Sequence, residues 1–364
     1  MHPYKNMPDS AYWSRAISRI STDDVDPVLG AQFQINLETK VATAGSCFAQ
    51  HIARHLRGSG FNYYVAENPH PIIPNSFLQE YNYGVFSARY GNIYTTRQLL
   101  QLFDRAFGYF EPQESFWQAS KYSWIDPFRP QIQPNGFTSV QELEADRGQH
   151  LKAVREMFKN LDVFVFTLGL TEGWVSRHDG TVYPICPGVS GGVFSPDNYL
   201  FKNFKAQEVV EDFQLFLDRL KIINPNAKIL LTVSPVPLIA TAENTHVLNA
   251  TTLSKAVLRV AAEDISIKNK NVAYFPSYEI ITGSFSRGSY FGQDCRSITE
   301  DGVNHVMKLF FKHYAKGINL NKQTNEKKKI FSQDEFANEM TEIAKVNCDE
   351  VYYDDELNVQ NIRK

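Results

Sequence analysis

Residues 41–49, Val-Ala-Thr-Ala-Gly-Ser-Cys-Phe-Ala, constrain the fold of this chain more than any other stretch. The β-branched and small apolar residues up to Ala44 are typical of a buried strand, which ends at Gly45-Ser46. Apolar residues at helical spacing follow at once, so a helix is expected directly after the serine. This order of strand, turn and helix places the Ser46 hydroxyl at the carboxyl edge of a sheet. Backbone N–H groups at a helix N-terminus there can hold a developing oxyanion.

Two roles for Ser46 are open at this stage. Serine is a preferred N-cap residue, so its hydroxyl can serve only to satisfy the first N–H groups of the helix. Alternatively, Ser46 is a nucleophile. Cys47 is a second candidate nucleophile, since thiols at helix N-termini ionise more easily, but its side chain is expected to point away from that of Ser46.

Strands and helices are expected to alternate along the chain, which predicts βαβ units, a mostly parallel sheet and a three-layer, doubly wound α/β fold. The apolar runs at 163–166 and 229–231 are nearly continuous, as in strands covered on both faces. The predicted strands are residues 40–44, 62–66, 162–168, 228–233 and 272–275. The predicted helices are residues 49–57, 96–107, 140–159, 206–222, 252–267, 300–314 and 333–345.

Composition restricts the classes of function. The chain has 364 residues, 43% of them hydrophobic, which is enough for a large core. The net charge is -3 and there is no basic stripe, which excludes nucleic acid as the main partner. The four cysteines are scattered, as in a reduced, cytoplasmic protein. We also expect no signal peptide and no transmembrane segment, because no apolar run is long enough.

Three parts of the chain are expected. Residues 1–38 are predicted to wrap the edge of the domain, and residues 39–317 to form the α/β domain. Two long insertions at 108–138 and 174–204 interrupt the strand–helix pattern; their aromatic content predicts a loop cap over the substrate. A hairpin turn is predicted at Asp179-Gly180 in the second insertion. Residues 318–364 are predicted to form a linker, one helix and a mobile tail.

Gly45-Ser46-Cys47-Phe48-Ala49 resembles the signature of the GSCFA family, which is similar to the GDSL/SGNH hydrolases. Four further blocks resemble that family, so that the likeness extends over roughly residues 1 to 316. These blocks are Asp126–Pro130, Phe166–Trp174, Leu231–Leu238 and Phe275–Glu279. The resemblance implies an SGNH-like fold with its catalytic residues spread over separate blocks.

In SGNH enzymes a serine after the first strand is the nucleophile, which the resemblance assigns to Ser46. A glycine and an asparagine from later blocks complete the oxyanion hole; Gly91-Asn92 resembles the first of these blocks, although a simple turn suits Gly-Asn equally. Thr171 occupies the position of the asparagine in the G-x-N-D block. Its hydroxyl can donate one hydrogen bond, from a shorter side chain. The resemblance implies no metal.

The block D-x-x-H of SGNH enzymes aligns with Asp294 onward, which leaves Ser297 at the histidine position. The nearest histidine is His305, inside the last predicted helix. Asp294 can orient His305 across the turn, or Asp301 can do so along the helix, since the two are four residues apart. A third alternative is that His246 supplies the base. A structural role for His305 is the competing interpretation.

Three other polar groups have weaker signals. His51 and His55 are spaced like a pair of metal ligands, but no third ligand is evident, which favours a solvated helix face. Arg129, in the first insertion, can bind an acidic substrate group or form a structural ion pair.

The expected function is that of a serine esterase or O-acyltransferase acting on a hydroxylated substrate, through an acyl group on Ser46. The resemblance to SGNH carbohydrate enzymes implies a glycan or glycan precursor, or another small molecule. No cofactor is required, and acetyl-CoA can be the acyl donor of a transferase. The alternative is a non-catalytic glycan-binding protein or polysaccharide-assembly component on the same scaffold, which the missing histidine at Ser297 favours. The sequence leaves the oligomeric state open.

Overall fold

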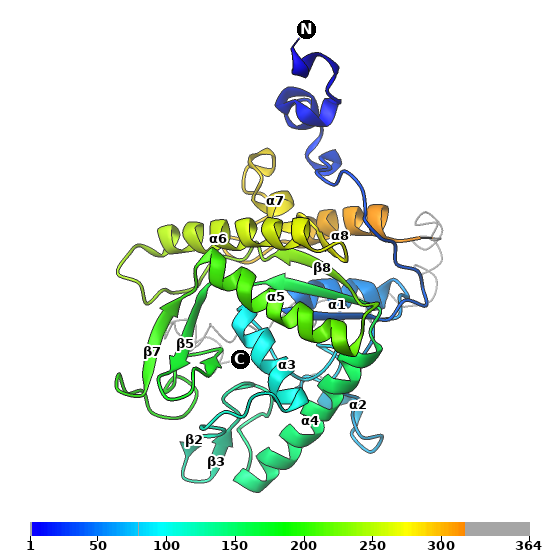
Figure 1. Cartoon of the computed structure of the whole chain (residues 1–364). Coiled ribbons are helices and arrows are strands. Elements are labelled where there is room, and N and C mark those ends of the chain that lie inside the picture. Colours follow the sequence, from blue (N-terminus) through cyan, green and yellow to red (C-terminus); the bar gives the residue numbers. More distant parts are fainter. Residues whose placement is uncertain (1, 79, 317–364) are drawn as a thin grey trace.

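The computed structural model describes residues 2–78 and 80–316 (Figure 1). The strands are β1 (Val41–Gly45), β2 (Trp117–Ser120), β3 (Ser123–Ile125), β4 (Val163–Leu168), β5 (Glu172–Ser176), β6 (Val182–Tyr183), β7 (Tyr199–Asn203), β8 (Lys228–Val233) and β9 (Val272–Tyr274). The α-helices are α1 (Phe48–Gly58), α2 (Asn75–Leu78), α3 (Thr96–Phe107), α4 (Val140–Asn160), α5 (Ala206–Ile223), α6 (Val247–Lys268), α7 (Ser277–Thr282) and α8 (Glu300–Tyr314).

A parallel sheet in the order β1-β4-β8-β9 forms the centre of the protein. The other edge of β1 pairs with Tyr63 through one parallel bridge, with hydrogen bonds from Val41 N to Asn62 O and from Tyr64 N to Val41 O. The predicted strand at 62–66 is therefore reduced to a bridge, because Ala66 N turns away to Ser87 O. The chain passes from one side of β1 to the other, which is the switch point where α/β sheets open a crevice.

Helices cover both faces of this sheet. Along β4, Val163 and Val165 pack with α1, α7 and α8, whereas Phe164, Phe166 and Leu168 pack with α3, α4, α5 and α6. This alternation places two apolar cores on the two sides of one sheet, as the period of two in a strand requires. The arrangement confirms the predicted three-layer α/β fold with its doubly wound, parallel sheet.

The two insertions pack against each other. The first contains the antiparallel pair β2–β3, and the second a sheet in the order β6-β5-β7. Trp117 and Phe128 of the first share one buried cluster with Tyr183 and Tyr199 of the second. Gly180 adopts a φ of +74° in the turn from β5 to β6, which confirms the predicted hairpin. Figure 1 shows both insertions on the side of the molecule that carries α3.

Residues 3–24 contain short 3₁₀ and π turns that project from the body of the protein (Figure 1). Contact with the domain begins at Thr22, whose hydroxyl donates to Phe285 O, and at Asp23, whose carbonyl accepts from Lys308 Nζ. Val25 is buried, and Ile35 forms a bridge with Ala315 beyond α8. Only the second half of the predicted wrapping segment therefore follows the domain edge. The predicted helix at 333–345 and the predicted tail lie outside the described residues.

None of the helices in residues 2–78 and 80–316 combines the length and apolar character that a membrane crossing requires.

Candidate active site

Ser46 follows the last residue of β1, at the carboxyl edge of the sheet. Gly45 has a φ of +136°, and a β-carbon there would clash with the backbone oxygen of Thr167 in β4. Glycine therefore lets the end of β1 approach β4 closely, and the Ser46 N–H donates to Thr167 O at 3.2 Å. The backbone of these two strands fixes where the hydroxyl lies.

The hydroxyl of Ser46 does not cap α1. Cys47 is the N-cap residue of that helix, and no side chain donates or accepts a capping bond there. Ser46 is only 3% exposed, and its Oγ has no hydrogen-bond partner in the described residues. A buried hydroxyl without a partner is rare in folded proteins and calls for an explanation. The N-cap interpretation of Ser46 is thus wrong, and the nucleophile interpretation remains.

Gly169, the first residue after β4, lies directly against Ser46. A β-carbon on Gly169 would stand 2.9 Å from Ser46 Cβ and 3.0 Å from Tyr94 O. Tyr94 O accepts hydrogen bonds from the N–H groups of Gly169 and Leu170, each at 3.1 Å, and Ile93 N donates to Gly45 O. The segment that contains Ile93 and Tyr94 is therefore pinned between the ends of β1 and β4.

A small cavity opens beside Ser46 at the carboxyl ends of β1, β4 and β8. Its described lining also includes Ser234, directly after β8, and the buried Lys255 of α6. Lys255 Nζ donates to Gly169 O at 2.6 Å. The full described lining is Ser46, Cys47, Tyr94, Gly169, Leu170, Ser234, Val236, Pro237, Leu238 and Lys255. No residue of the 174–204 insertion is in this set, whereas we expected that insertion to face Ser46.

Gly91 and Asn92, the predicted oxyanion donors, precede Tyr94, which lines this cavity. Gly91 has a φ of +70° with open space where a β-carbon would be, as in a turn. The Asn92 Oδ1 accepts from Gln50 Nε2 at 3.1 Å. Neither residue lines the described part of the Ser46 cavity, so their donor role stays a prediction.

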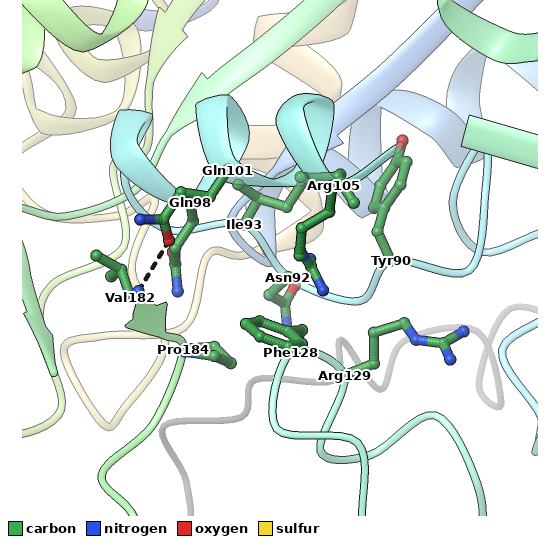
Figure 2. Close-up of a pocket in the computed structure, with 11 residues that line it drawn as sticks. Tyr90, Asn92, Ile93, Gln98, Gln101, Arg105, Phe128, Arg129, Val182 and Pro184 are labelled. Atoms are coloured by element: carbon green, nitrogen blue, oxygen red, sulfur yellow. Dashed lines mark hydrogen bonds between the residues drawn. The ribbon is translucent and has the colours of Figure 1, made fainter. Parts of the chain in front are cut away.

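Asn92 instead lines a second cavity, between α3 and the first insertion (Figure 2). Figure 2 shows Arg105 descending from α3 toward Asn92 and Phe128. The Arg105 guanidinium stacks on the Phe128 ring at 3.6 Å, and burial lowers the pKa of Arg105 to about 9. The described lining is Tyr90, Asn92, Ile93, Gln98, Gln101, Leu102, Arg105, Phe128, Arg129, Val182 and Pro184.

Arg129, beside this cavity, belongs to a buried ion-pair network. Its guanidinium contacts Asp126 at 2.9 Å and Asp146 at 2.7 Å, and Asp146 in turn pairs with Arg89. Burial favours the neutral acid, but the charges of Arg129 and of neighbouring arginines hold the pKa of Asp126 well below its usual range. The structural ion pair is therefore the alternative that the geometry supports for Arg129.

Thr171, the third predicted donor, is hydrogen-bonded to residues of β7 and α6. Its hydroxyl donates to Asn203 Oδ1 of β7 at 2.6 Å, and its backbone N–H donates to Ser254 Oγ of α6 at 3.1 Å. The residue is 1% exposed and is not among the described residues around Ser46. These bonds join β4, β7 and α6, which explains a small hydroxyl side chain at this position.

The structure does not bring His305 and Asp294 together. His305 Nε2 donates to Val25 O at 2.9 Å, and Nδ1 accepts from Tyr290 Oη at 2.8 Å. A carbonyl can only accept, so the proton resides on Nε2. Burial lowers the pKa of His305, which keeps the ring neutral. Because Val25 and Tyr290 occupy both ring nitrogens, His305 fastens the N-terminal segment to α8 rather than pairing with Asp294 or Asp301.

Asp294 has its own local partners. Its Oδ1 accepts from the N–H groups of Arg296 and Ser297 and from Ser297 Oγ, within one turn. Burial alone would raise the pKa of Asp294, but these hydrogen bonds lower it below its usual value. The carboxylate therefore stabilises the turn that carries Ser297.

The other histidines considered from the sequence are also engaged elsewhere. His246 is the N-cap of α6, where its Nδ1 accepts from Leu248 N at 3.1 Å. His55 Nδ1 bonds His51 O, and burial lowers the pKa of His51 to about 3. In residues 2–78 and 80–316 no three His, Cys, Asp or Glu side chains gather in a possible metal site.

Lys255 and Gly169 were not assigned roles from the sequence. Lys255 precedes Leu258, Ala262 and Ile265 at helical spacing, all of them buried. A lysine among the buried apolar residues of a helix is unusual, and this pattern in the sequence could have marked Lys255 as a candidate functional residue. The contact of Gly169 with Ser46 left no local trace in the sequence.

A sequence model of the GSCFA family matches residues 40–310. The comparison with curated proteins found no match. Among solved structures, the chain is similar to an acetyl xylan esterase from the rumen bacterium Butyrivibrio proteoclasticus, with 13% identity and a TM-score of 0.29. That match covers 75% of this chain and 64% of the esterase chain. The family match extends over well over half of the chain and includes Ser46 and Lys255, so this protein belongs to the GSCFA family.

Proposed function

We propose that this protein is a serine esterase or O-acyltransferase that acts through an acyl group on Ser46. The observation that carries the proposal is the buried Ser46 hydroxyl, which has no hydrogen-bond partner in the described residues and lines a cavity at the sheet's switch point. A hydroxyl kept from structural hydrogen bonds is available to attack a bound carbonyl. Water accepts the acyl group in an esterase, and a substrate hydroxyl accepts it in a transferase.

The proposed substrate is a hydroxylated compound, either a glycan or a glycan precursor. Support for a sugar comes from the family resemblance. For a transferase, an acyl thioester such as acetyl-CoA is the proposed donor. Asn92 and the Gly91 N–H are the proposed oxyanion donors; His305 and Asp294 are left out, because their contacts hold them elsewhere.

A non-catalytic glycan-binding protein is the second candidate. It is favoured by one observation: no histidine lines the described part of the Ser46 cavity, and His305 has both ring nitrogens occupied. Such a protein would bind its ligand with Ser46 unreacted. The two candidates therefore differ in a single measurable property, the reactivity of Ser46.

The test is covalent labelling with a fluorophosphonate, which reacts with activated serines. The wild-type protein is expected to take up one label, and Ser46→Ala none. Ser286→Ala is the matched control: Ser286 is also buried, but its hydroxyl is hydrogen-bonded to Gly283 O, and this variant should label as the wild type does. Equal labelling of wild type and Ser46→Ala, or no labelling of either, would exclude the enzyme and favour the binding protein.

A further inference from the structure

A buried lysine shares the cavity of Ser46. Lys255 extends from α6, is 2% exposed and lines the same cavity as the Ser46 side chain. Lysine is among the residues least often fully buried, because its ammonium loses hydration there. Such a position needs a reason that packing alone does not supply.

Gly169 connects the lysine to the serine. Lys255 Nζ donates to the Gly169 carbonyl at 2.6 Å, and the space beside the Gly169 Cα is filled by Ser46 Cβ. Lys255 and Ser46 therefore both contact Gly169, and both line the same cavity. The neighbouring Ser254 fixes the same loop through its bond to Thr171 N. Residues 254 and 255 of α6 thus position both the loop and the amine.

Apolar side chains supply much of the described lining of this cavity. Leu170, Val236, Pro237 and Leu238 line the cavity with Ser46 and Lys255. Removing an ammonium from water into such a site favours its neutral form. A neutral amine can still donate to Gly169 O, and it also has a lone pair that can accept a proton.

We infer that Lys255 is the general base and acid for Ser46, in place of a histidine. The inference rests on the proposed acyl-serine function. In the first step the Ser46 Oγ–H proton passes to the Lys255 amine while Oγ bonds to the acyl carbon. The carbonyl electron pair moves to oxygen. When the tetrahedral adduct collapses, the bond to the leaving oxygen breaks and the Lys255 ammonium returns the proton to that oxygen. Water or an acceptor hydroxyl then gives its proton to the Lys255 amine and attacks the acyl carbon. As the bond between Ser46 Oγ and the acyl group breaks, the ammonium returns that proton to Oγ.

Three variants separate this role from a structural one. Lys255→Arg keeps a donor for Gly169 O, but arginine stays protonated and cannot accept a proton. Lys255→Met keeps the length and apolar stem without the amine. Lys255→Ala leaves space that a small primary amine such as ethylamine can enter. The readout is the rate of fluorophosphonate labelling at Ser46 as a function of pH, with the melting temperature as the test of folding.

The expected result is a labelling rate that rises with pH in the wild type and falls on the order of a hundredfold in Lys255→Arg and Lys255→Met. Ethylamine should restore labelling of Lys255→Ala, whereas ethanol, which has no basic nitrogen, should not. Lys268→Met is the matched control: Lys268 lies on the same helix but is exposed, and its labelling should equal that of the wild type.

Two outcomes would overturn the inference while leaving the proposed function intact. One is labelling of Lys255→Arg at the wild-type rate, which would show that the residue acts only through its positive charge and not as a proton acceptor. The other is slow labelling of Lys255→Ala that ethylamine does not accelerate. Lys255 would then only hold Gly169 in place through its hydrogen bond. If Lys255→Ala does not fold, the Arg and Met variants decide the question alone. Absence of labelling in the wild type would overturn both the inference and the proposed function.

Discussion

Gly169 and Ser46 are packed so closely that the first has room only for a hydrogen where any other residue carries a β-carbon. That carbon would stand 2.9 Å from Ser46 Cβ, and the next neighbour, Tyr94 O, is backbone and cannot swing aside. The glycine that follows β4 therefore sets the position of the hydroxyl that follows β1. The position of Ser46 therefore depends on a residue more than a hundred positions away in sequence.

Gly169→Ala is expected to displace Ser46 or Tyr94, with a loss of about 1–3 kcal/mol in the free energy of unfolding. Labelling at Ser46 should fall much more than the fraction of folded protein. Urea unfolding and labelling rates measure the two effects. Gly148→Ala in α4 is the control, because a β-carbon there meets nothing within 4 Å and alanine favours a helix; it should gain about 0.5–1 kcal/mol. Normal labelling in Gly169→Ala would show that this contact does not position the hydroxyl.

Gly45→Ala tests the close approach of β1 to β4. The alanine would have to adopt a φ of +136° and would clash with the Thr167 backbone, so a loss of about 3 kcal/mol or more is expected. Gly60→Ala is the comparison: Gly60 also has a positive φ, +77°, but a β-carbon there has open space. Its cost should be only about 1 kcal/mol, from backbone strain. Equal losses in thermal unfolding would contradict the close approach.

His305 is expected to be structural. His305→Gln should lower the free energy of unfolding by about 1–3 kcal/mol, because Val25 O and Tyr290 Oη lose well-placed partners. Ser46 labelling per folded molecule should be unchanged. The opposite pattern, an unchanged melting temperature with labelling lost, would restore His305 as the base.

The pH dependence of the free energy of unfolding also tests whether His305 is a buried, neutral structural residue. Burial lowers its pKa below the unfolded value of about 6.5, so the folded protein prefers the neutral ring. The stabilisation is complete above that value and is lost as the pH falls through it. The free energy of unfolding should therefore drop on acidification below about pH 6.5 more steeply in the wild type than in His305→Gln. Identical slopes would show that His305 does not titrate differently on folding.

The ion-pair network beside the second cavity predicts a separate acid response. Burial works against ionisation of Glu67, but the nearby His150 and Arg129 lower the pKa of Glu67 to about 2. Its contribution is present above the unfolded value near 4.5 and is lost as the pH falls from there toward 2. Glu67→Gln should lower the free energy of unfolding at neutral pH by about 3 kcal/mol, because the buried Arg89 loses a counter-charge. It should also make the free energy of unfolding less dependent on pH between 4.5 and 2. Glu144→Gln, at an exposed position of α4, should do neither.

Much of the fold could be predicted because its signals are local. The continuous apolar run of 163–166 marked a central strand, and the helices at 96–107 and 300–314 have the predicted bounds. The start of α6 was placed five residues too late, at 252 rather than Val247, because its N-cap is His246, a residue that seldom caps helices. The strand at 62–66 was wrong in extent, since its pairing depends on contacts with distant chain.

The site could be predicted only where it is local. Ser46 was found because strand, turn and helix are consecutive in the sequence. Lys255 and Gly169 are joined to each other by a hydrogen bond across 86 residues, and Gly169 packs against Ser46. No pattern at short spacing in the sequence reports such contacts. The sequence favours His305 as the base because serine nucleophiles are commonly paired with a histidine. Burial and hydrogen bonding, which a sequence does not show, assign that ring to the N-terminal segment instead.

The most direct test of this account is mass spectrometry after brief reaction with an activated acetyl ester and an acid quench. One acetyl group is expected in the wild type, which peptide fragmentation should locate on Ser46, and none is expected in Ser46→Ala. An acetyl group on Cys47, or an unmodified Ser46 while the ester is hydrolysed, would contradict it.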